Sequence, residues 1–336
     1  MKRNMTQWID QTLAASKKDG FLVCSFPAIQ KMGITVKELI SSSDLQAKAM
    51  KLVADLCPEA TCSVSMMDLS VEAECFGSTI RFSDDEVPTV IGGIITDEDE
   101  ADALEIPKVG AGRTQIYIDA IGKAMELITD RPVLAGVIGP FSLAGRLMDV
   151  TEALVLCYEE PEMVETVLEK CTAFLIDYIK AYKAVGANGV VMAEPLAGML
   201  SPNLEKSFSA PYVKRIIEAV QDENFVVCYH NCGDNTVLQA QSIIQNGSRL
   251  LHFGNSINMA DMLPLIPEHI LCMGNVDPAN ELMRGTPESV KAATKSVMEK
   301  CSGYSNFVVS SGCDVPPLSP WENIRAFYEA VSEFNA

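Results

Sequence analysis

Apolar runs of strand length alternate with helical patterns through most of the chain. After residue 130 there are six such runs, each short and bounded by turn residues. They lie at 133–139, 189–193, 225–230, 250–253, 270–274 and 307–311. Two further strand candidates precede them, at 21–25 and 61–66. Strands that alternate with helices in this way form parallel sheets with helical crossovers.

Helical patterns fill the intervals between these runs. The helices expected after residue 130 cover 152–185, 203–220, 236–245, 259–266, 287–301 and 320–334, with Pro161 in the first turn of a second helix. Before residue 130, helices are expected up to residue 18 and at 37–40, 45–56, 67–74 and 112–130. The segments 79–82 and 86–91 are expected to be extended, and the acidic segment 97–102 to be a turn or a helix cap.

Eight such units predict an α/β protein with a closed (β/α)8 barrel, the TIM barrel. An open, doubly wound sheet is the alternative, although no glycine-rich dinucleotide fingerprint follows the first strands. No repeat, low-complexity tract or linker divides the sequence. We therefore expect a single barrel domain over residues 1–336. An N-terminal region of about 130 residues would decorate the regular βα units at 131–336.

The amino-acid composition and net charge of the chain exclude some classes of binding partner. The chain has 336 residues, of which 48% are hydrophobic, as in folded globular proteins. Its net charge of −19 argues against nucleic acids and anionic membranes as partners, because both bind basic surfaces. The start lacks the apolar core of a signal peptide, and no stretch reaches the length of a membrane span. The odd number of cysteines, 11, then predicts reduced thiols in a cytoplasmic protein.

Two strand ends carry metal-ligating residue types. The strand expected at 225–230 leads into His230 and Cys232, which are two residues apart and so project to one side of an extended chain. The strand expected at 307–311 is followed by Cys313. In a parallel sheet both ends lie at the same edge, so the three side chains can meet. Imidazole and thiolate are zinc ligands, and a catalytic zinc keeps three protein ligands and one open position.

Other polar residues follow the expected strands. Asp68 and Glu194 are the candidate catalytic residues, because a carboxylate after an apolar run is seldom left without a partner. Glu194 would orient the metal-binding histidine or contact substrate. The candidate cofactor-binding residues are Asn255, Asn275 and Asp277. Each of these residues also fits a helix cap or a turn, and Asp277 before Pro278 fits an N-cap especially well.

The segment 310–313, Ser-Ser-Gly-Cys, raises the question of a serine or cysteine nucleophile. Such a nucleophile needs a histidine beside it. His252 is expected inside a strand and His269 in a turn, so neither is expected to serve. We therefore do not expect a protease-like Cys–His site.

Six segments carry a family resemblance: HNCGD at 230–234, MGNVDPANELMRGTPESV at 273–290, SSGCDVPPLSPWENIRAF at 310–327, VIGPFSLA at 137–144, EPLAGMLSPNLEKSFSAPYVKRI at 194–216 and MDLSVEAECFG at 67–77. They resemble the uroporphyrinogen decarboxylase superfamily. Within it they are most similar to the corrinoid methyltransferase branch, which includes methylcobamide:coenzyme M methyltransferases. The resemblance extends from about residue 60 to the C-terminus.

The resemblance implies a (β/α)8 barrel and a zinc ion bound by His230, Cys232 and Cys313. It also implies that a zinc-bound thiolate attacks the methyl group of a methylated corrinoid carried by a separate protein. Glu194 and Asp68 would position substrate or take part in removing the thiol proton. The true decarboxylases begin with an arginine-rich segment that binds substrate carboxylates, whereas FLVCSFPAIQKMG at 21–33 has no arginine. This departure argues against decarboxylation.

Three alternatives stay open at this point. The methyl acceptor is coenzyme M, another thiol or a folate, and a folate would use a different nucleophile. A decarboxylase of the same superfamily would need no metal. A non-catalytic barrel would use zinc only to stabilise its loops, or would dock a corrinoid protein. No motif in the sequence predicts the oligomeric state.

Overall fold

The computed structural model describes residues 3–336 and is built around one curled parallel sheet of seven strands. In sheet order the strands are β1 (Ser63–Val64), β4 (Val133–Ile138), β5 (Gly189–Ala193), β6 (Val226–Asn231), β7 (Leu250–Phe253), β8 (Leu271–Val276) and β9 (Phe307–Ser311). Every neighbouring pair in this order is parallel. The carboxyl ends of all seven strands therefore lie at one edge of the sheet.

The N-terminal segment lies between the two edges of this sheet. The N–H of Phe21 donates to Val309 O at 3.0 Å, and the N–H of Ser311 donates to Phe21 O at 3.2 Å, which makes an isolated parallel bridge to β9. On the other side, Ser25 Oγ donates to Val64 O of β1 at 2.5 Å. The strand predicted at 21–25 is therefore reduced to a bridge at one residue. The ladder stops there because Val23 N–H donates to the Ser311 side chain rather than to a backbone carbonyl.

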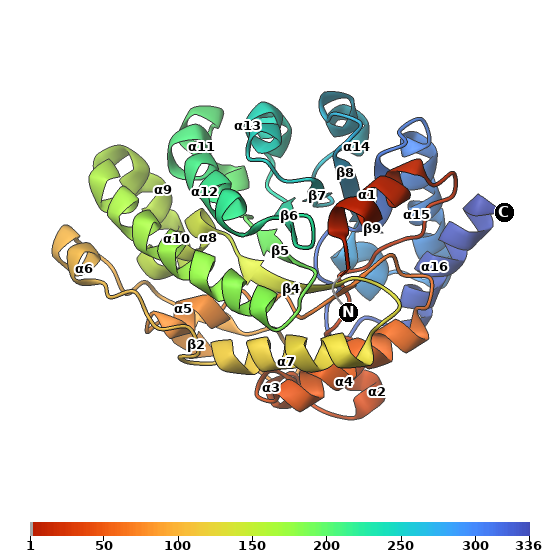
Figure 1. Cartoon of the computed structure of the whole chain (residues 1–336), viewed down its shortest axis with the longest axis horizontal. Coiled ribbons are helices and arrows are strands. Elements are labelled where there is room, and N and C mark those ends of the chain that lie inside the picture. Colours follow the sequence, from red (N-terminus) through yellow and green to blue (C-terminus); the bar gives the residue numbers. More distant parts are fainter. Residues whose placement is uncertain (1–2) are drawn as a thin grey trace.

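Helices cover the outer face of the sheet (Figure 1). After β4 they are α8 (Pro140–Met148), α9 (Val150–Glu159), α10 (Pro161–Ala184), α11 (Pro202–Phe208), α12 (Ala210–Val220), α13 (Ala240–Gln245), α14 (Met259–Met262), α15 (Pro287–Cys301) and α16 (Trp321–Asn335). Short 3-10 turns lie at Ala197–Met199, Thr236–Gln239 and Leu263–Leu265, and a π-helical turn at Pro278–Met283. The alternation predicted after residue 130 is confirmed.

The N-terminal region contributes helices and a separate two-stranded hairpin. They are α1 (Met5–Ala14), α2 (Ala28–Met32), α3 (Val36–Ile40), α4 (Ser43–Leu56), α5 (Val71–Cys75), α6 (Glu98–Ala103), α7 (Thr114–Leu127) and the antiparallel hairpin of β2 (Thr79–Arg81) and β3 (Thr89–Ile91). Asp97 caps α6, since its side chain accepts the N–H of Glu100. The acidic segment is thus a cap followed by a helix.

Prolines account for most of the differences in the helices. The break predicted at Pro161 is confirmed, because Pro161 begins α10. The helix predicted over 203–220 is split at Ser209, and Pro211, which has no N–H to donate, lies in the first turn of α12. Pro140 begins α8, a helix that the apolar pattern did not predict. The helix predicted over 67–74 begins only at Val71.

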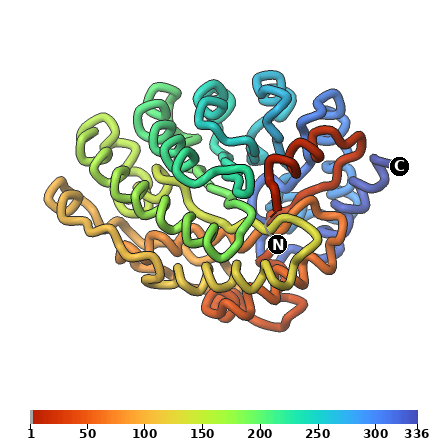
Figure 2. The backbone as a smooth tube through the Cα atoms, viewed as in Figure 1, coloured from red at the N-terminus to blue at the C-terminus, as the bar shows by residue number. Residues whose placement is uncertain are grey.

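Two apolar clusters hold these layers together. The larger packs the helices against the outer face of the sheet, and the smaller fills the concave inner face. Helix α1 covers the inner cluster at the amino ends of the strands, where Met5 and Ile9 are buried. Figure 2 shows this N-terminal segment beside the C-terminal units, and Asn335 donates a hydrogen bond to Lys18 O at 3.0 Å. No helix within residues 3–336 is both long and apolar enough to cross a membrane.

Candidate metal centre

A cavity of about 80 Å³ lies at the carboxyl ends of the strands. Its polar lining residues are His230, Cys232, His252, Cys313 and Asp314, and its apolar ones are Val23, Met67, Leu69, Val191, Ala193 and Pro195. The three predicted metal ligands thus line one cavity. They come from β6 and from the loops that follow β6 and β9, as the strand-end argument predicted.

Close backbone packing shapes the loop that carries Cys232. Strand β6 is buried along its whole length and ends at Asn231. A Cβ on Gly254, just after β7, would lie 2.2 Å from the Cys232 Cβ, so only glycine leaves room for this cysteine. A Cβ on Gly233 would lie 2.4 Å from the backbone of Gly198. These glycines let the loops after β5, β6 and β7 meet at the edge of the cavity.

Hydrogen bonds fix the ring of His230. Its Nδ1 lies 3.2 Å from His252 O and 2.7 Å from His252 Nδ1. The other ring nitrogen, Nε2, is buried and has no hydrogen-bond partner within residues 3–336. A metal-binding histidine has this arrangement, in which one nitrogen is held by hydrogen bonding and the other is left for the ion. Nε2 of His230 is therefore suited to ligation.

The two cysteines interact with each other. A hydrogen bond with Cys313 lowers the pKa of Cys232, although burial opposes this change. The same hydrogen bond, together with burial, raises the pKa of Cys313 to about 12. Of the two thiols, Cys232 is therefore the more acidic. Thiolates are the form in which cysteine binds metals.

The described residues, 3–336, contain no group of three or more His, Cys, Asp or Glu side chains already arranged around a common metal position. The two thiols face each other, and the ring of His230 is close enough to Cys313 to lower the pKa of that thiol in part. The donor types fit zinc, and the orphaned Nε2 supports ligation at this place. The metal triad therefore stays a prediction.

Glu194 lies just after β5, but its carboxylate is directed at helix α8. Its Oε1 accepts the N–H of Phe141 at 2.6 Å, and its Oε2 accepts the N–H and the hydroxyl of Ser142 at 3.0 and 2.7 Å. A Cβ on Gly139 would lie 2.2 Å from Glu194 Cγ, so a glycine is needed beside it. The contact of Glu194 with His230 is through the backbone, from its N–H to His230 O at 2.8 Å. Its catalytic role stays a prediction.

Asp68 is buried within a polar cluster behind the cavity. Its Oδ2 accepts hydrogen bonds from Tyr117 OH at 2.7 Å and from the guanidinium of Arg113. Its Oδ1 accepts the N–H and the hydroxyl of Ser70 at 3.1 and 2.6 Å. The neighbouring residues Met67 and Leu69, rather than Asp68, line the cavity. The ion pair with Arg113 gives Asp68 a structural partner, and its predicted catalytic role is untested.

The predicted cofactor-binding residues lie elsewhere. Asn255, Asn275 and Asp277 all line a cavity of about 300 Å³ between the loops after β7 and β8 and helix α15. Asn275 Nδ2 donates to Gly254 O at 2.9 Å. Asp277 accepts the N–H groups of Ala279 and Asn280, so the N-cap interpretation of Asp277 is confirmed. These three residues line a different cavity from His230, Cys232 and Cys313, although Asn255 packs against Gly312, next to Cys313.

One residue of the cavity, His252, was missed by sequence reasoning, whereas Asp314, which follows Cys313 at the strand end, lines the cavity as its position predicts. His252, set aside as a strand residue, pairs in register with His230, and its Nε2 lies 2.8 Å from Ser310 Oγ. Burial and the neighbouring His230 hold its pKa well below the ordinary value, so the ring is neutral. Asp314 accepts the N–H of Met67 at 3.1 Å. No signal in the sequence marked His252, because only the register of β6 and β7 shows that it projects to the same face as His230.

Comparisons with known proteins agree with this architecture. Residues 16–334 match the family model described as uroporphyrinogen decarboxylase. A methylcobamide:CoM methyltransferase of Methanosarcina mazei is 26% identical over 276 residues, which cover 80% of this chain and 78% of that protein. A uroporphyrinogen decarboxylase of Prochlorococcus marinus is 26% identical over 226 residues, 65% of this chain and 63% of that protein.

Solved structures share the fold. A methyltransferase from Methanosarcina mazei superposes with a TM-score of 0.86 at 22% identity and covers 100% of this chain and 99% of its own. A B12-independent methionine synthase from Shewanella superposes with a TM-score of 0.60 at 14% identity, covering 89% of this chain and 88% of its own. The family model spans nearly the whole sequence, from before the Phe21 bridge to the end of α16. The chain belongs to the uroporphyrinogen decarboxylase family.

Proposed function

We propose that this protein is a zinc-dependent methyltransferase that moves a methyl group from a methylated corrinoid to a thiol. One observation carries the proposal: the unpartnered Nε2 of His230 lies in the same cavity as the mutually hydrogen-bonded thiols of Cys232 and Cys313. The similarity to methylcobamide:CoM methyltransferases supports methyl transfer as the reaction. We also propose that the segment around Phe21 takes the place of the eighth strand and completes the barrel.

In this proposal His230, Cys232 and Cys313 hold the zinc. The ion would supply a site at which an acceptor thiol loses its proton and is bound as an electron-rich thiolate. Both cysteines would have to be thiolates to hold the ion, so Cys313, whose thiol keeps its proton more firmly, would give that proton up. His252 keeps the imidazole of His230 in place through its Nδ1 and its carbonyl, while Ser310 holds His252 from the other side.

The remaining lining residues restrict what can enter. Six apolar residues surround the polar group, which keeps water away from the acceptor sulfur. Asp314 is held at the edge of the cavity by the N–H of Met67, where it can hydrogen-bond the acceptor. A corrinoid protein would present its methyl group from the open carboxyl-end face. Glu194 and Asp68, which are fully engaged nearby, would support the loops rather than contact the acceptor.

The charge of the lining residues also indicates which methyl acceptors the cavity can favour. Among residues 3–336, neither a lysine nor an arginine lines the cavity, so no described cationic side chain there matches a carboxylate-rich porphyrinogen. This argues against decarboxylation of such a substrate. Without a cationic side chain in the lining, the cavity also has no group that would prefer the sulfonate of coenzyme M to an uncharged thiol. We therefore propose a small thiol, with coenzyme M as one candidate.

Elemental analysis tests the metal site first. We expect about one zinc per chain in the wild type and a loss of most of it in Cys313→Ser. The matched control is Cys75→Ser, because Cys75 is also partly exposed but lies outside the cavity. Retention of zinc by Cys313→Ser, or zinc-free wild-type protein after purification with added zinc, would contradict the metal site.

Absorbance spectroscopy tests the reaction. Methylcobalamin is mixed with the zinc-loaded protein and either coenzyme M or the uncharged 2-mercaptoethanol, and its loss is followed. We expect thiol-dependent demethylation that is absent in Cys313→Ser and retained in Cys75→Ser. Zinc binding with no demethylation by either thiol, even with corrinoid proteins supplied, would exclude thiol methylation and leave the zinc as a structural ion.

A further inference from the structure

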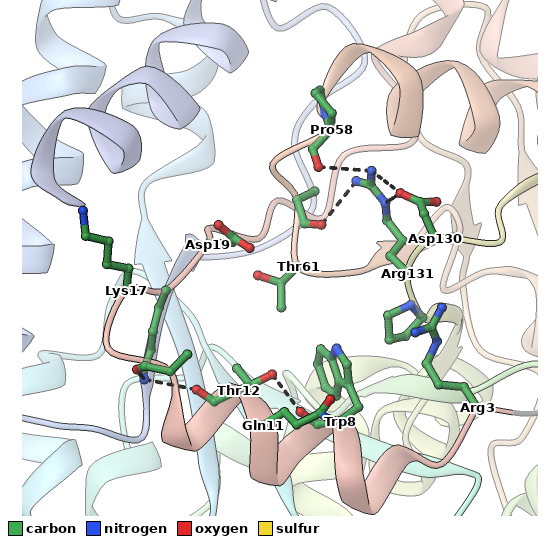
Figure 3. A pocket seen from close by; sticks show the side chains of 14 residues that line it. Arg3, Trp8, Gln11, Thr12, Lys17, Asp19, Pro58, Thr61, Asp130 and Arg131 are labelled. Atoms are coloured by element: carbon green, nitrogen blue, oxygen red, sulfur yellow. Dashed lines mark hydrogen bonds and ion pairs between the residues drawn. The ribbon is translucent and has the colours of Figure 1, made fainter. Parts of the chain in front are cut away.

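A second cavity, of about 370 Å³, lies at the opposite end of the sheet from the candidate metal centre. It is bounded by α1, by the loop before β1 and by the loop before β4, at the amino ends of the strands (Figure 3). Its volume is within the range of small-molecule sites. Neither the proposed zinc site nor methyl transfer uses any of its residues, so the inference below is independent of both.

Helix α1, which forms one side of the cavity, is firmly placed. The N–H groups of Met5 and Thr6 donate to Glu223 O at 2.7 and 3.1 Å. Ile9 is buried with Met5 in the inner apolar cluster, and Asp10 pairs with Arg249 at 2.9 Å. Since these contacts lie on the faces directed away from the cavity, they fix which side of α1 is left to line it.

The opposite wall is built on a buried arginine. The guanidinium of Arg131 donates to Cys57 O at 2.8 Å and to Pro58 O at 3.2 Å, and it binds the carboxylate of Asp130 at 2.7 and 2.9 Å. Arg131 is only 7% exposed. These bonds hold the loop before β1 against the start of β4. The wall is therefore preorganised, which lowers the entropic cost of binding a ligand.

The lining is cationic in a strongly anionic chain. Among residues 3–336 it contains Arg3, Lys17, Lys18 and Arg131 and two carboxylates, whereas the whole chain has a net charge of −19. The charges of Asp130 and Arg131 offset each other in an ion pair, and the ammonium of Lys18 donates to Thr12 O and Ala15 O at 3.1 and 2.6 Å. The binding of an anion therefore depends on Arg3 and Lys17. Arg3 uses one guanidinium nitrogen to donate to Thr129 O at 3.1 Å, which leaves further N–H groups for an anion.

The aromatic side chain of Trp8 lines the same cavity as these basic residues. Figure 3 shows the indole of Trp8 at the cavity between Arg3 and Gln11, with Thr61 across from it. The indole nitrogen of Trp8 and the ammonium of Lys17 make no hydrogen bond within the part of the chain that the structure describes, residues 3–336. A planar ring stacks well on indole, and a guanidinium binds phosphate oxygens.

We propose that this cavity binds a small aromatic phosphate of about the size of a nucleoside monophosphate. Its ring lies against Trp8, and its phosphate accepts hydrogen bonds from Arg3. Lys17, at the rim, adds to the attraction of the anion. The cavity lies beneath α1, which covers the inner core, so a bound ligand would also stabilise the amino end of the barrel.

The chain provides its own reporter for this site. It has two tryptophans, and the other, Trp321, is 8% exposed and donates its indole N–H to Pro27 O at 3.1 Å. Titration with adenosine 5′-monophosphate should give a saturable change in tryptophan fluorescence. Adenosine and inorganic phosphate, tested separately, should each bind at least tenfold more weakly. Equal affinity of inorganic phosphate and the nucleotide would overturn the aromatic part of the proposal.

Two variants separate the affinity for the nucleotide from the fluorescence signal that reports its binding. Arg3→Gln should raise the Kd about tenfold, while Arg215→Gln, which removes an exposed arginine paired with Glu169, should leave it unchanged. Trp8→Phe should abolish the fluorescence change but keep nucleotide binding in equilibrium dialysis, because phenylalanine still stacks. An unchanged Kd in Arg3→Gln, a full fluorescence response in Trp8→Phe, or no saturable binding of the nucleotide in dialysis would overturn the proposal.

Discussion

At the scale of single residues, the candidate site shows which side chains a sequence can place. His230 and Cys232 could be paired because a strand directs residues two apart to one side. Cys313 followed from the parallel order of the strands. His252 could not be placed in the same way, since a histidine inside an apolar run gives no sign of which face it occupies. Only the register between β6 and β7 brings it beside His230.

Replacing His252 by phenylalanine tests its part in the metal site. The ring shape is retained, but the hydrogen bonds to His230 Nδ1 and Ser310 Oγ are lost. Loss of such a supporting bond typically weakens metal binding 10- to 100-fold. We expect a zinc Kd raised by about that factor, measured by competition with a chromophoric chelator.

The control for this substitution is His269→Phe. His269 is the third histidine of the chain and is exposed in the turn before β8. Its replacement should leave zinc affinity unchanged. A His252→Phe protein that binds zinc as tightly as the wild type would show that the backbone carbonyl of His252 alone positions His230.

At the scale of secondary structure elements, the central strands were predictable and their connections less so. Strands β4 to β9 are continuous apolar runs, because a parallel sheet covered by helices is buried on both faces. Helix α8 was missed because its sequence is buried almost throughout and so has no polar face to reveal a helical period. The position of Glu194 follows from this helix, which needs an acceptor at its N-terminus.

Glu194→Gln separates a capping role from a catalytic one. The carboxylate accepts two backbone N–H groups and one hydroxyl at the start of α8, and the amide directs an NH2 group at one of these donors. We expect a loss of about 1–3 kcal/mol in the free energy of unfolding. Urea denaturation measures this loss, and zinc content should stay at the wild-type value.

The same variant also bears on catalysis. If Glu194 only caps α8, thiol-dependent demethylation of methylcobalamin per folded, zinc-loaded chain should fall less than about threefold at a temperature where the variant is folded. A fall of 100-fold or more with unchanged stability would show instead that Glu194 acts on the reacting groups, as the sequence suggested.

At the scale of the whole molecule, the order of the strands was easier to predict than the closure of the sheet. Six regular βα units fix a parallel sheet, whereas the segments at 21–25 and 61–66 yield one bridged residue and a two-residue strand. Both segments are short, and side-chain hydroxyls of Ser25 and Ser311 replace some backbone pairing there. Propensity cannot detect such pairing, because it depends on partners far away in the sequence.

The proposed metal centre would join the loops after β6 and β9, so its occupancy should affect the stability of the whole chain. A ligand that binds only the folded state, at 100 times its Kd, adds about 2.7 kcal/mol to the free energy of unfolding. For a chain of 336 residues this corresponds to a Tm increase of roughly 2–8 °C.

We therefore expect a strong chelator to lower the Tm of the wild type by that amount in differential scanning calorimetry, and excess zinc to restore it. Cys313→Ser should melt at one temperature with or without chelator. An identical Tm for zinc-loaded and zinc-depleted wild type would mean that the loops are already fixed without the ion, through contacts such as those of Gly254 with Cys232.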